Sequence, residues 1–557
     1  MYGGEVMREA NSSLLDREFA KFLARRSILS TEKRKLFEGI VCRLSESLAA
    51  GDSCLLLGRG EQDIVLASNL TGDGSGAHPL CLAGDRLYLQ RTFQYEQRLA
   101  TQVQKMVADS ASLPVNGALL DILFPESPGG ADWQRYAAVQ ALERRFLIIS
   151  GGPGTGKTTV VVNILALLQS ACGGQLKVAL AAPTGKAAMR LQESVSSSRE
   201  RLHAAGVSGE GIPERAFTIH RLLGVKHYSP FFRHTAANPL GYDVVVIDEA
   251  SMVDLALMSK LVDALRPGSR LILLGDKDQL VSVESGTVFA DMIHSLPGNT
   301  VGLQHSYRFN EGIRKFAAVI NGGEAGRAWS VLVADEPVNV TLLHGEVAEY
   351  GGSIYSRYME AVAVATDLES YELLFDSFNA FKILCAMRHG PSGVHMVNAA
   401  VERYLTKRGY DCSSDSWYRG RPVMVTRNEY GLDLYNGDIG LCLPDPVKPD
   451  VLKIWFKKPD GRLQGLLPAR LGCCETVYAL TIHKSQGAEF EEVLVVLPDK
   501  ISAVVSRELL YTAVTRARES VMLRTERFVF DAAVTEKVTR SSGLAELLGA
   551  EEQRPDE

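Results

Sequence analysis

A glycine-rich segment at residues 151–158, G-G-P-G-T-G-K-T, constrains the fold of this chain more than any other part of the sequence. It fits the pattern G-x-x-x-x-G-K-[ST], follows the β-rich run RFLIIS and precedes the helical run TVVVNILALLQ. Glycines let backbone N–H groups turn inward around phosphate oxygens, and the N-terminus of the following helix faces the same anion. The segment therefore predicts a nucleotide-phosphate site between a strand and a helix.

Two further segments end in polar residues that suit phosphate chemistry. D-V-V-V-I-D-E-A (243–250) predicts a buried strand with Asp248 placed to hold Mg²⁺ through water and Glu249 placed to polarise an attacking water. In L-L-G-D-K-D-Q-L (273–280), Gln279 is placed to sense the γ-phosphate. We expect Lys157 to reach the β/γ-phosphates and Thr158 to ligate Mg²⁺. The expected nucleotide-binding turn comprises Gly151, Gly152, Pro153, Gly154, Thr155, Gly156, Lys157, Thr158 and Thr159.

Alternating apolar runs predict an α/β fold. Between residues 145 and 280, RFLIIS, KVALAAP, DVVVIDEA and RLILLGD are short β-rich runs separated by helical patterns, as in a doubly wound parallel sheet. Functional side chains in such sheets gather at the carboxyl ends of the strands. After residue 345, the runs FKILCAM, VLKIWF, EEVLVVLP and SVMLRT predict a second α/β domain that contains a small β-rich insert.

The length of 557 residues allows three or four domains. We expect a small N-terminal domain at residues 1–115, a first parallel-sheet domain at 116–340 and a second at 341–545. The β-rich insert is expected at residues 421–474, and an acidic, disordered tail at 546–557.

Composition excludes some classes of protein. The 60 Lys and Arg residues against 66 Asp and Glu residues give a net charge of −6, so a wholly basic surface is excluded and any nucleic-acid site must be a local groove. No apolar run is long enough to span a bilayer, and the first residues contain no secretory h-region. The nine cysteines form no C-x-x-C pair, which favours a reduced, cytoplasmic protein without a zinc or iron–sulfur site.

A P-loop followed by D-E-A-S and G-D-K-D-Q-L resembles the superfamily-one helicases. The resemblance implies ATP hydrolysis in a cleft between two RecA-like domains, with Gln134 of W-Q-R-Y-A-A reading adenine. It also implies that Arg308 of S-Y-R-F and Arg516 of Y-T-A-V-T-R-A-R reach the phosphates. An arginine delivered across such a cleft stabilises charge on the transferring phosphoryl group and couples closure to chemistry.

The same resemblance assigns DNA contacts. A-L-T-I-H-K-S-Q-G-A-E-F (479–490) is hard to explain as core packing because most of its residues are polar or small. By resemblance this segment brings Gly487 and Glu489 near the nucleotide. For His220 a structural role stays open beside the DNA contact, which would suit sequence-independent binding of a single strand. The residues implied to contact DNA are Thr184, Thr218, His220, Arg388, Thr481, His483 and Ser485.

Together with L-Y-L-Q-R-T-F-Q-Y-E, L-Y-N-G-D-I-G and R-S-S-G-L-A-E, these motifs resemble the RecD family, the alpha subunits of the bacterial exodeoxyribonuclease V (RecBCD) complex. The resemblance implies a 5′→3′ DNA helicase of the 1B branch, in a heterotrimer with RecB-like and RecC-like subunits that acts on double-strand ends in recombinational repair. Nuclease activity is then expected in a partner subunit.

Two alternatives stay open. One is a stand-alone RecD-like helicase, although such helicases carry a long N-terminal extension and only about 130 residues precede Gln134 here. The other is a regulatory nucleotide-binding subunit without productive translocation. The leading domain, including Tyr88 and Tyr95, is expected to dock on the RecC-like partner, with core packing of these tyrosines as the equal alternative.

Overall fold

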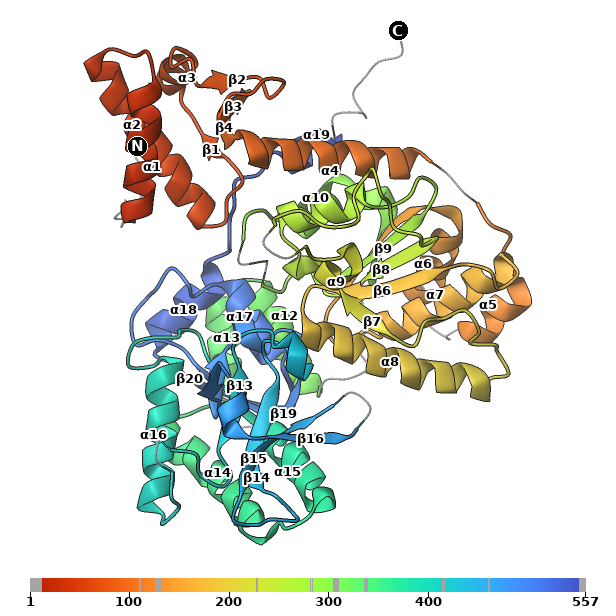
Figure 1. The fold of residues 1–557 in the computed structure, drawn as a ribbon, viewed down its shortest axis with the longest axis vertical. Helices are drawn as coiled ribbons and strands as arrows, with labels where there is room; N and C mark the ends of the chain where they lie inside the picture. Colours follow the sequence, from red (N-terminus) through yellow and green to blue (C-terminus); the bar gives the residue numbers. More distant parts are fainter. Residues whose placement is uncertain are drawn as a thin grey trace.

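A computed structural model describes the chain except for residues 1–12, 110–111, 126–131, 227–228, 281, 283, 304–309, 335–338, 413–415, 459–460 and 550–557. Figure 1 shows a small N-terminal domain, a first parallel-sheet domain, and a second parallel-sheet domain that carries an antiparallel insert. In the part of the chain that is described, no helix combines the length and the apolar character needed to cross a membrane.

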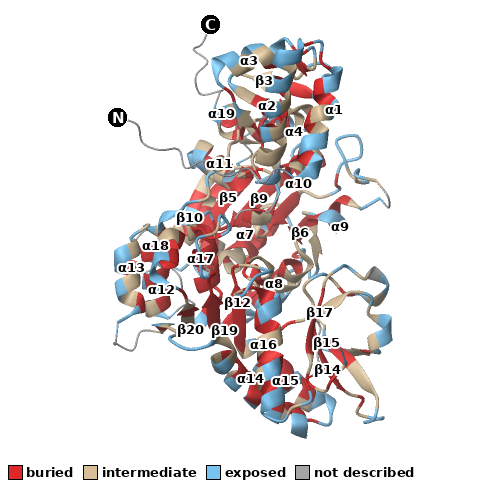
Figure 2. Cartoon of the chain, turned by 90° about the vertical axis from the view of Figure 1, so that its left-hand side faces the viewer, coloured by how far each residue is buried: buried red, intermediate tan, exposed pale blue. Residues whose placement is uncertain are grey.

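The first sheet has six strands in the order β10-β5-β9-β8-β6-β7, and every neighbouring pair is parallel. Side chains alternate along a strand, so Leu147 and Ile149 of β5 pack in one core while Phe146 and Ile148 pack in another. Burial on both faces explains the continuous apolar runs of the sequence, and Figure 2 shows β5 and β9 buried. The strands are β5 (Phe146–Gly151), β6 (Val178–Ala182), β7 (Ala216–Thr218), β8 (Val244–Ile247), β9 (Arg270–Gly275) and β10 (Thr300–Leu303).

Helices cover both faces of this sheet. Four share one core with it: α5 (Gly117–Leu123), α6 (Trp133–Glu143), α7 (Lys157–Ala171) and α8 (Gly185–Ala204). Five share the other core: α4 (Gln90–Ala108), α9 (Ile219–Leu223), α10 (Leu255–Asp263), α11 (Val288–Ser295) and α19 (Leu544–Gly549). Helix α7 is apolar around most of its circumference because it lies between the sheet and its neighbours α6 and α8.

The second sheet has five strands in the order β11-β20-β19-β12-β18, again all parallel. They are β11 (Val340–Leu342), β12 (Phe381–Cys385), β18 (Ala479–Thr481), β19 (Phe490–Val496) and β20 (Ala517–Arg524). The helices that pack in the same core are α14 (Val347–Val364), α15 (Leu368–Ala380), α16 (Val394–Lys407), α17 (Arg507–Val514) and α18 (Arg527–Thr535).

An antiparallel sheet of order β16-β15-β14-β13-β17 interrupts this domain between α16 and β18. Its strands are β13 (Pro422–Val425), β14 (Ile439–Pro444), β15 (Leu452–Lys457), β16 (Leu463–Leu466) and β17 (Cys474–Thr476). The run VLKIWF is therefore a strand of the insert. Two parallel sheets, a small N-terminal domain and this β-rich insert confirm the predicted α/β fold class.

The packing divides the chain at other residues than those predicted. Helices α12 (Glu311–Asn321) and α13 (Ala325–Leu332), expected in the first parallel-sheet domain, pack in the core of the second. Helix α4 (Gln90–Ala108), expected in the N-terminal domain, places Leu99 and Val103 in the core of the first parallel-sheet domain. The residues 546–549 that were expected in a disordered tail end helix α19 (Leu544–Gly549), whose Leu544 and Leu548 are buried in that same core. This last difference arises because α19 buries its apolar side chains on one face. The acidic composition of the chain end does not reveal such burial.

The N-terminal domain contains α1 (Leu14–Arg26), α2 (Thr31–Ala49), α3 (Arg59–Leu66) and a four-stranded sheet of β1 (Leu55–Leu56), β2 (Thr71–Gly72), β3 (Leu80–Ala83) and β4 (Arg86–Leu89). Tyr88 is 2% exposed, so core packing, the alternative kept open above, describes it. Tyr95 packs partly buried against α10, where Lys260 lies over its ring.

A buried carboxylate joins the N-terminal domain to the end of the chain. Glu96 is fully buried and accepts hydrogen bonds from the hydroxyls of Ser53 and Ser542 and from the backbone N–H of Gly543. Burial raises the pKa of Glu96. The motifs L-Y-L-Q-R-T-F-Q-Y-E and R-S-S-G-L-A-E, far apart in sequence, therefore form one contact.

We predict that Gly543→Ala destabilises the protein. A Cβ at residue 543 would lie 2.1 Å from the Tyr88 hydroxyl and 3.1 Å from a Glu96 carboxylate oxygen. Relieving this overlap in a buried contact should cost about 1–3 kcal/mol. The urea midpoint of unfolding should fall for Gly543→Ala and stay unchanged for Gly549→Ala, where the added Cβ meets nothing within 4 Å. Equal midpoints for the two variants would contradict the packing described.

Candidate active site

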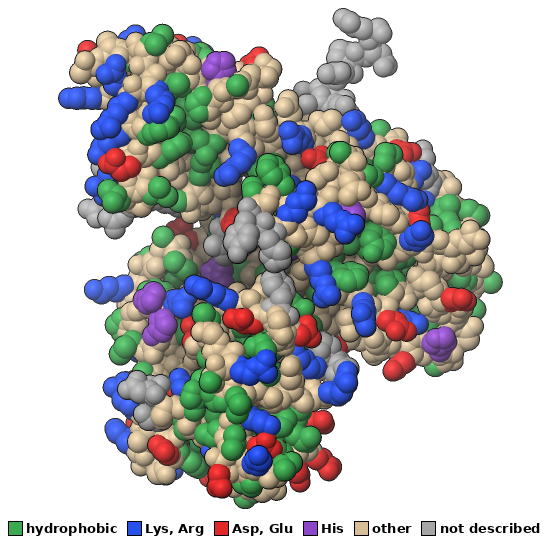
Figure 3. Space-filling view, in the orientation of Figure 1, with side chains coloured by type: hydrophobic (Ala, Val, Ile, Leu, Met, Phe, Trp, Pro, Cys, Tyr) green, Lys and Arg blue, Asp and Glu red, His purple; other side chains and the backbone are tan. Residues whose placement is uncertain are grey.

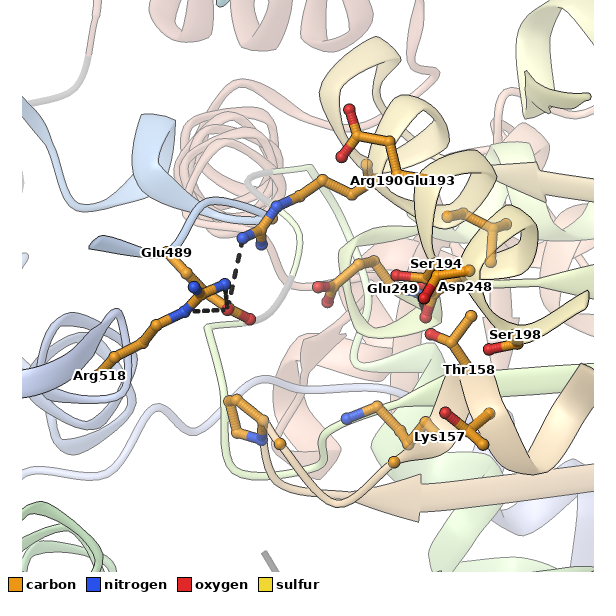
Figure 4. A pocket seen from close by; sticks show the side chains of 18 of the residues that line it. Lys157, Thr158, Arg190, Glu193, Ser194, Ser198, Asp248, Glu249, Glu489 and Arg518 are labelled. Carbon is orange, nitrogen blue, oxygen red and sulfur yellow. Dashed lines mark hydrogen bonds and ion pairs between the residues drawn. The ribbon is translucent and has the colours of Figure 1, made fainter. Parts of the chain in front are cut away.

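A cavity of about 410 Å³ lies between the two parallel-sheet domains, at the carboxyl ends of β5 and β8. Figure 4 shows side chains from both domains pointing into it. The residues that the sequence predicted at the nucleotide and that line this cavity are Pro153, Gly154, Gly156, Lys157, Thr158, Thr159, Asp248, Glu249, Gln279, Gly487, Glu489 and Arg516. The two predicted halves of the site are thus brought together.

The P-loop connects β5 to α7 and needs glycine for its path. Gly154 and Gly156 have φ of +77° and +79°, the left-handed region that disfavours other residues. The ammonium of Lys157 donates hydrogen bonds to the carbonyls of Gly151 at 2.6 Å and Gly152 at 3.1 Å. A Cβ on Gly152 would lie 3.1 Å from the Tyr511 hydroxyl, so the loop touches the second parallel-sheet domain directly.

Two carboxylates follow β8. Glu249 has φ of +51°, a strained conformation for a non-glycine residue of the kind found at functional sites, and its backbone N–H donates to Asp248 at 2.9 Å. Burial, together with the charge of Glu249 and against that of Lys157, raises the pKa of Asp248 to about 6. A desolvated carboxylate beside a second one gains from a cation. Asp248 and the hydroxyl of Thr158 are oxygen donors on the same cavity, a set that suits Mg²⁺.

The segment after β9 is hydrogen-bonded across to the second parallel-sheet domain. Its Leu280 N–H donates to the Thr512 hydroxyl at 2.9 Å, and its Leu280 carbonyl accepts from the Gln486 side chain at 3.2 Å. All three residues are buried. Asp276, in the same segment, accepts from the Tyr511 hydroxyl at 3.2 Å. The end of the first sheet and helix α17 therefore form one continuous network.

Gln279 takes part in this network. It is 3% exposed, and its amide nitrogen donates to the Asp276 carboxylate at 3.0 Å. Burial raises the pKa of Asp276. The sequence singled out Gln279 but missed Asp276, although both lie in G-D-K-D-Q-L, and it missed Tyr511, Thr512 and Gln486 altogether. Their partners lie more than 200 residues away, so no local pattern could reveal these bonds.

Arg516 reaches the cavity from the segment that joins α17 to β20. Its side chain is fixed because Nε donates to the Thr512 carbonyl at 3.1 Å and Nη1 to the Ala488 carbonyl at 3.2 Å. The residue is 2% exposed, yet Nη2 has no hydrogen-bond partner among the residues that the structure describes. A buried, held guanidinium with one nitrogen to satisfy suits a phosphate ligand. Arg308, the other predicted arginine, lies outside the described residues.

Glu489 links the two sides of the cavity. Its carboxylate pairs with Arg518 at 2.9 Å on its own domain and with Arg190 of α8 at 3.5 Å across the cavity, as Figure 4 shows. The sequence missed Arg190. Gln134 is not among the residues that line the cavity, and its amide donates to the P-loop carbonyl of Thr155 at 3.3 Å. Its contact with adenine stays a prediction.

Two of the predicted DNA contacts are helix caps at one edge of the first sheet. Thr184 follows β6 and Thr218 is the last residue of the adjacent strand β7, and each hydroxyl accepts from a backbone N–H at the start of the next helix at 3.2 Å. His220 is exposed with its ring edge-on to Phe232 at 5.7 Å. Thr184 and Thr218 are half-buried, and their contact with DNA stays a prediction.

The predicted DNA contacts in the second parallel-sheet domain fall into two groups, side chains that are at least partly accessible and one that is buried. Thr481 and His483 follow β18 and are half-buried, and Arg388 is exposed but pairs with Glu475 at 3.1 Å. Burial and nearby Arg540 lower the pKa of His483. Ser485 corrects the prediction: it is fully buried and its hydroxyl donates to the Ile482 carbonyl at 2.7 Å, so it presents nothing to DNA. The one-turn helix at His483–Ser485 turns it inward.

Comparison with known proteins supports this site. Residues 134–285 match the AAA domain family, and residues 476–523 match the UvrD-like helicase C-terminal domain. The chain is 38% identical over 527 residues to the RecBCD enzyme subunit RecD of Mycolicibacterium smegmatis, covering 92% of each. It is 32% identical to the RecD subunit of Haemophilus influenzae, covering 84% of this chain and 81% of that one.

Two further comparisons cover a smaller share of this chain or of the relative. The ATP-dependent RecD2 DNA helicase of Deinococcus radiodurans is 31% identical, covering 84% of this chain and 59% of that one. A solved Bacteroides Pif1 structure bound to single-stranded DNA is 17% identical, with a TM-score of 0.39, covering 71% of this chain and 91% of that chain.

A P-loop cavity closed by a second parallel-sheet domain, together with these family matches, defines an ATP-dependent DNA helicase of superfamily one. Within that class, RecD subunits are 32–38% identical to this chain over most of its length. The chain belongs to the RecD family.

We predict that Arg516→Ala retains ATP binding and loses hydrolysis. Removing an arginine that stabilises the transferring phosphoryl group should lower kcat by about 10³-fold. Steady-state ATPase assays and binding of a fluorescent ATP analogue would measure the two effects. Arg524→Ala, at the half-buried last residue of β20 and paired with Glu526, is the matched control. A kcat within about threefold of the unmodified protein would remove Arg516 from the site.

Proposed function

We propose that this chain couples ATP hydrolysis to 5′→3′ movement along single-stranded DNA, as a subunit of a RecBCD-type helicase–nuclease that acts on double-strand ends in recombinational repair. The observation that carries the motor assignment is the buried bonding of Leu280 to Thr512 and Gln486. Because these hydrogen bonds join the two domains, a displacement at the phosphates is transmitted to the second parallel-sheet domain. A bacterial protein that acts on the ends of chromosomal DNA would do so in the cytoplasm, so a cytoplasmic location is part of this proposal.

In the proposed reaction, Lys157 and Arg516 contact the β/γ-phosphates from opposite sides of the cavity, and Glu249 accepts a proton from the attacking water. Gln279, held by Asp276, orients that water or the γ-phosphate. The Thr158 hydroxyl and Asp248 would hold Mg²⁺, which neutralises phosphate charge when bound. Gln134 braces the P-loop in this proposal.

The proposed DNA path crosses the edge of both sheets. On the first sheet it meets Thr184, Thr218 and His220, and on the second it meets Thr481, His483 and Arg388. Figure 3 shows basic and acidic side chains mixed on the face it draws, so the strand would be held by local contacts instead of a broad basic surface. The 5′→3′ direction of movement is proposed only because this chain belongs to the RecD family.

We predict that Lys157→Gln abolishes strand displacement. The assay uses the complex reconstituted with its RecB-like and RecC-like partners, with the partner motor inactivated, on duplexes with a 5′ or a 3′ single-stranded tail. The unmodified chain should unwind the 5′-tailed duplex only. Lys177→Gln, an exposed lysine of the first parallel-sheet domain, should behave like the unmodified chain.

The result separates the open alternatives. ATP hydrolysis without unwinding of either duplex would favour the regulatory subunit, and unwinding of the 3′-tailed duplex would reverse the polarity. Unwinding by the chain purified alone would favour a stand-alone helicase.

The N-terminal domain is the proposed docking surface for the RecC-like partner. It exposes large apolar side chains on α1, α2, α3 and the turn after α1: Leu14 (74%), Leu15 (77%), Ile28 (74%), Leu36 (54%) and Leu66 (56%). Exposed apolar side chains gathered on one small domain indicate a protein interface. The relatives named as RecBCD subunits supply the kind of partner.

We predict that the double variant Leu15→Glu, Ile28→Glu reduces co-purification with the two partners at least tenfold. Charges at an apolar interface must be desolvated without a counter-ion, which weakens binding. Intrinsic ATPase activity should not change. The control is Val364→Glu with Val447→Glu, equally exposed (79% and 85%) but on the second parallel-sheet domain. Equal loss in both double variants would contradict the assignment.

A further inference from the structure

The first two turns of α8 face the second parallel-sheet domain along their length. A Cβ on Gly185 would lie 3.0 Å from Cβ of Tyr435, a residue of the antiparallel insert. The Lys186 ammonium lies 6.0 Å from the centre of the Phe490 ring. A Cβ on Gly487 would lie 3.5 Å from Cβ of Ala187. Arg190, one turn further, pairs with Glu489.

The same two turns join the proposed DNA path to the nucleotide cavity. Thr184 caps the helix at the DNA end, and Arg190 lines the cavity with Lys157 and Glu249. Six residues of α-helix span about 9 Å, and a helix of this kind moves as one rigid unit. A displacement of Thr184 by DNA would therefore shift Arg190.

The ion pair at Glu489 can lose one partner at low cost. The Glu489 side chain is 7% exposed and has both Arg518 at 2.9 Å and Arg190 at 3.5 Å. A buried carboxylate left with no cation would be strongly destabilising. Because Arg518 holds Glu489 at the shorter distance, Arg190 can turn away without leaving an unpaired charge.

We propose that Arg190 exchanges Glu489 for a phosphate of bound ATP, and that DNA at the N-terminus of α8 drives this exchange. A triphosphate carries more charge than one carboxylate and accepts two hydrogen bonds from a planar guanidinium. Arg190 is then a phosphate-contacting residue whose position reports DNA occupancy. The inference rests on the proposed DNA contact at Thr184 and deepens the proposed function.

The test measures ATP turnover with and without a single-stranded oligonucleotide in the intact protein. Four forms are compared: unmodified, Arg190→Ala, Arg190→Lys and Arg199→Ala. Arg199 lies on the same helix but pairs with Glu214 on the surface. We expect Arg190→Ala to lower the DNA-stimulated kcat at least thirtyfold and the ratio of DNA-stimulated to basal kcat at least tenfold.

The Arg190→Lys variant tests whether the geometry of the guanidinium group is required in addition to its charge. Arg190→Lys keeps the charge and loses the two-pronged geometry, so we expect it to recover part of the stimulation. Arg199→Ala should match the unmodified protein. Glu489→Gln should raise the basal kcat by releasing Arg190, and this rise should vanish when combined with Arg190→Ala.

The outcomes separate the two claims. If DNA does not stimulate the unmodified protein, the proposed function fails. If it does, and Arg190→Ala is stimulated by the same factor, the relay through Arg190 is overturned. Equal loss of basal and stimulated turnover overturns it too, because Arg190 would then serve hydrolysis without reporting DNA.

Discussion

The hydrogen bonds of Leu280 to the second parallel-sheet domain are the constraint on which the rest of this structure depends. Backbone N–H and carbonyl groups buried away from water must be paired, and among the described residues those of Leu280 are paired with Thr512 and Gln486. Separating the domains at this point would exchange these two hydrogen bonds for bonds to water, a net loss of about 0.5–1.5 kcal/mol each. The two sheets are therefore held in register at the segment that also carries Gln279.

Arg516 illustrates the opposite case, in which a buried polar atom has no hydrogen-bond partner among the described residues. Two of its nitrogens are satisfied by carbonyls, and Nη2 is buried without a partner among the described residues. Such a group lowers stability until a ligand pairs with it. A phosphate oxygen would pair best when charge builds on it during transfer, so the stabilisation goes to the transition state. In the proposed function, the second parallel-sheet domain therefore contributes to catalysis as well as to DNA binding.

The sequence predicted those features that depend on local pattern. The P-loop, the acidic pair after β8 and the strands β5, β6, β8 and β9 follow from glycine spacing and apolar runs, and the structure has each of them. The short strands β7 and β10 of the same sheet were not predicted. Arg516 was found through resemblance, and its placement on the cavity agrees. Arg190 was missed because an arginine on a helix has no local mark that separates a surface charge from one facing a second domain.

Other features could not be predicted because they depend on how distant segments pack. The pairing of Tyr511 with Asp276 joins residues 235 positions apart. Ser485 was expected at DNA through the helicase resemblance, but a single helical turn buries its hydroxyl. The end of helix α19, residues 546–549, was expected in the acidic tail, yet Leu544 and Leu548 dock this helix on the first parallel-sheet domain.

The central claim is that the nucleotide site is completed by the second parallel-sheet domain. A structure of the protein with ADP and aluminium fluoride, a mimic of the transferring phosphoryl group, tests it most directly. The account predicts Nη2 of Arg516 at about 3 Å from the fluoride group, with the Leu280–Thr512 hydrogen bond intact. A complex in which only residues of the first parallel-sheet domain contact the fluoride group would contradict it.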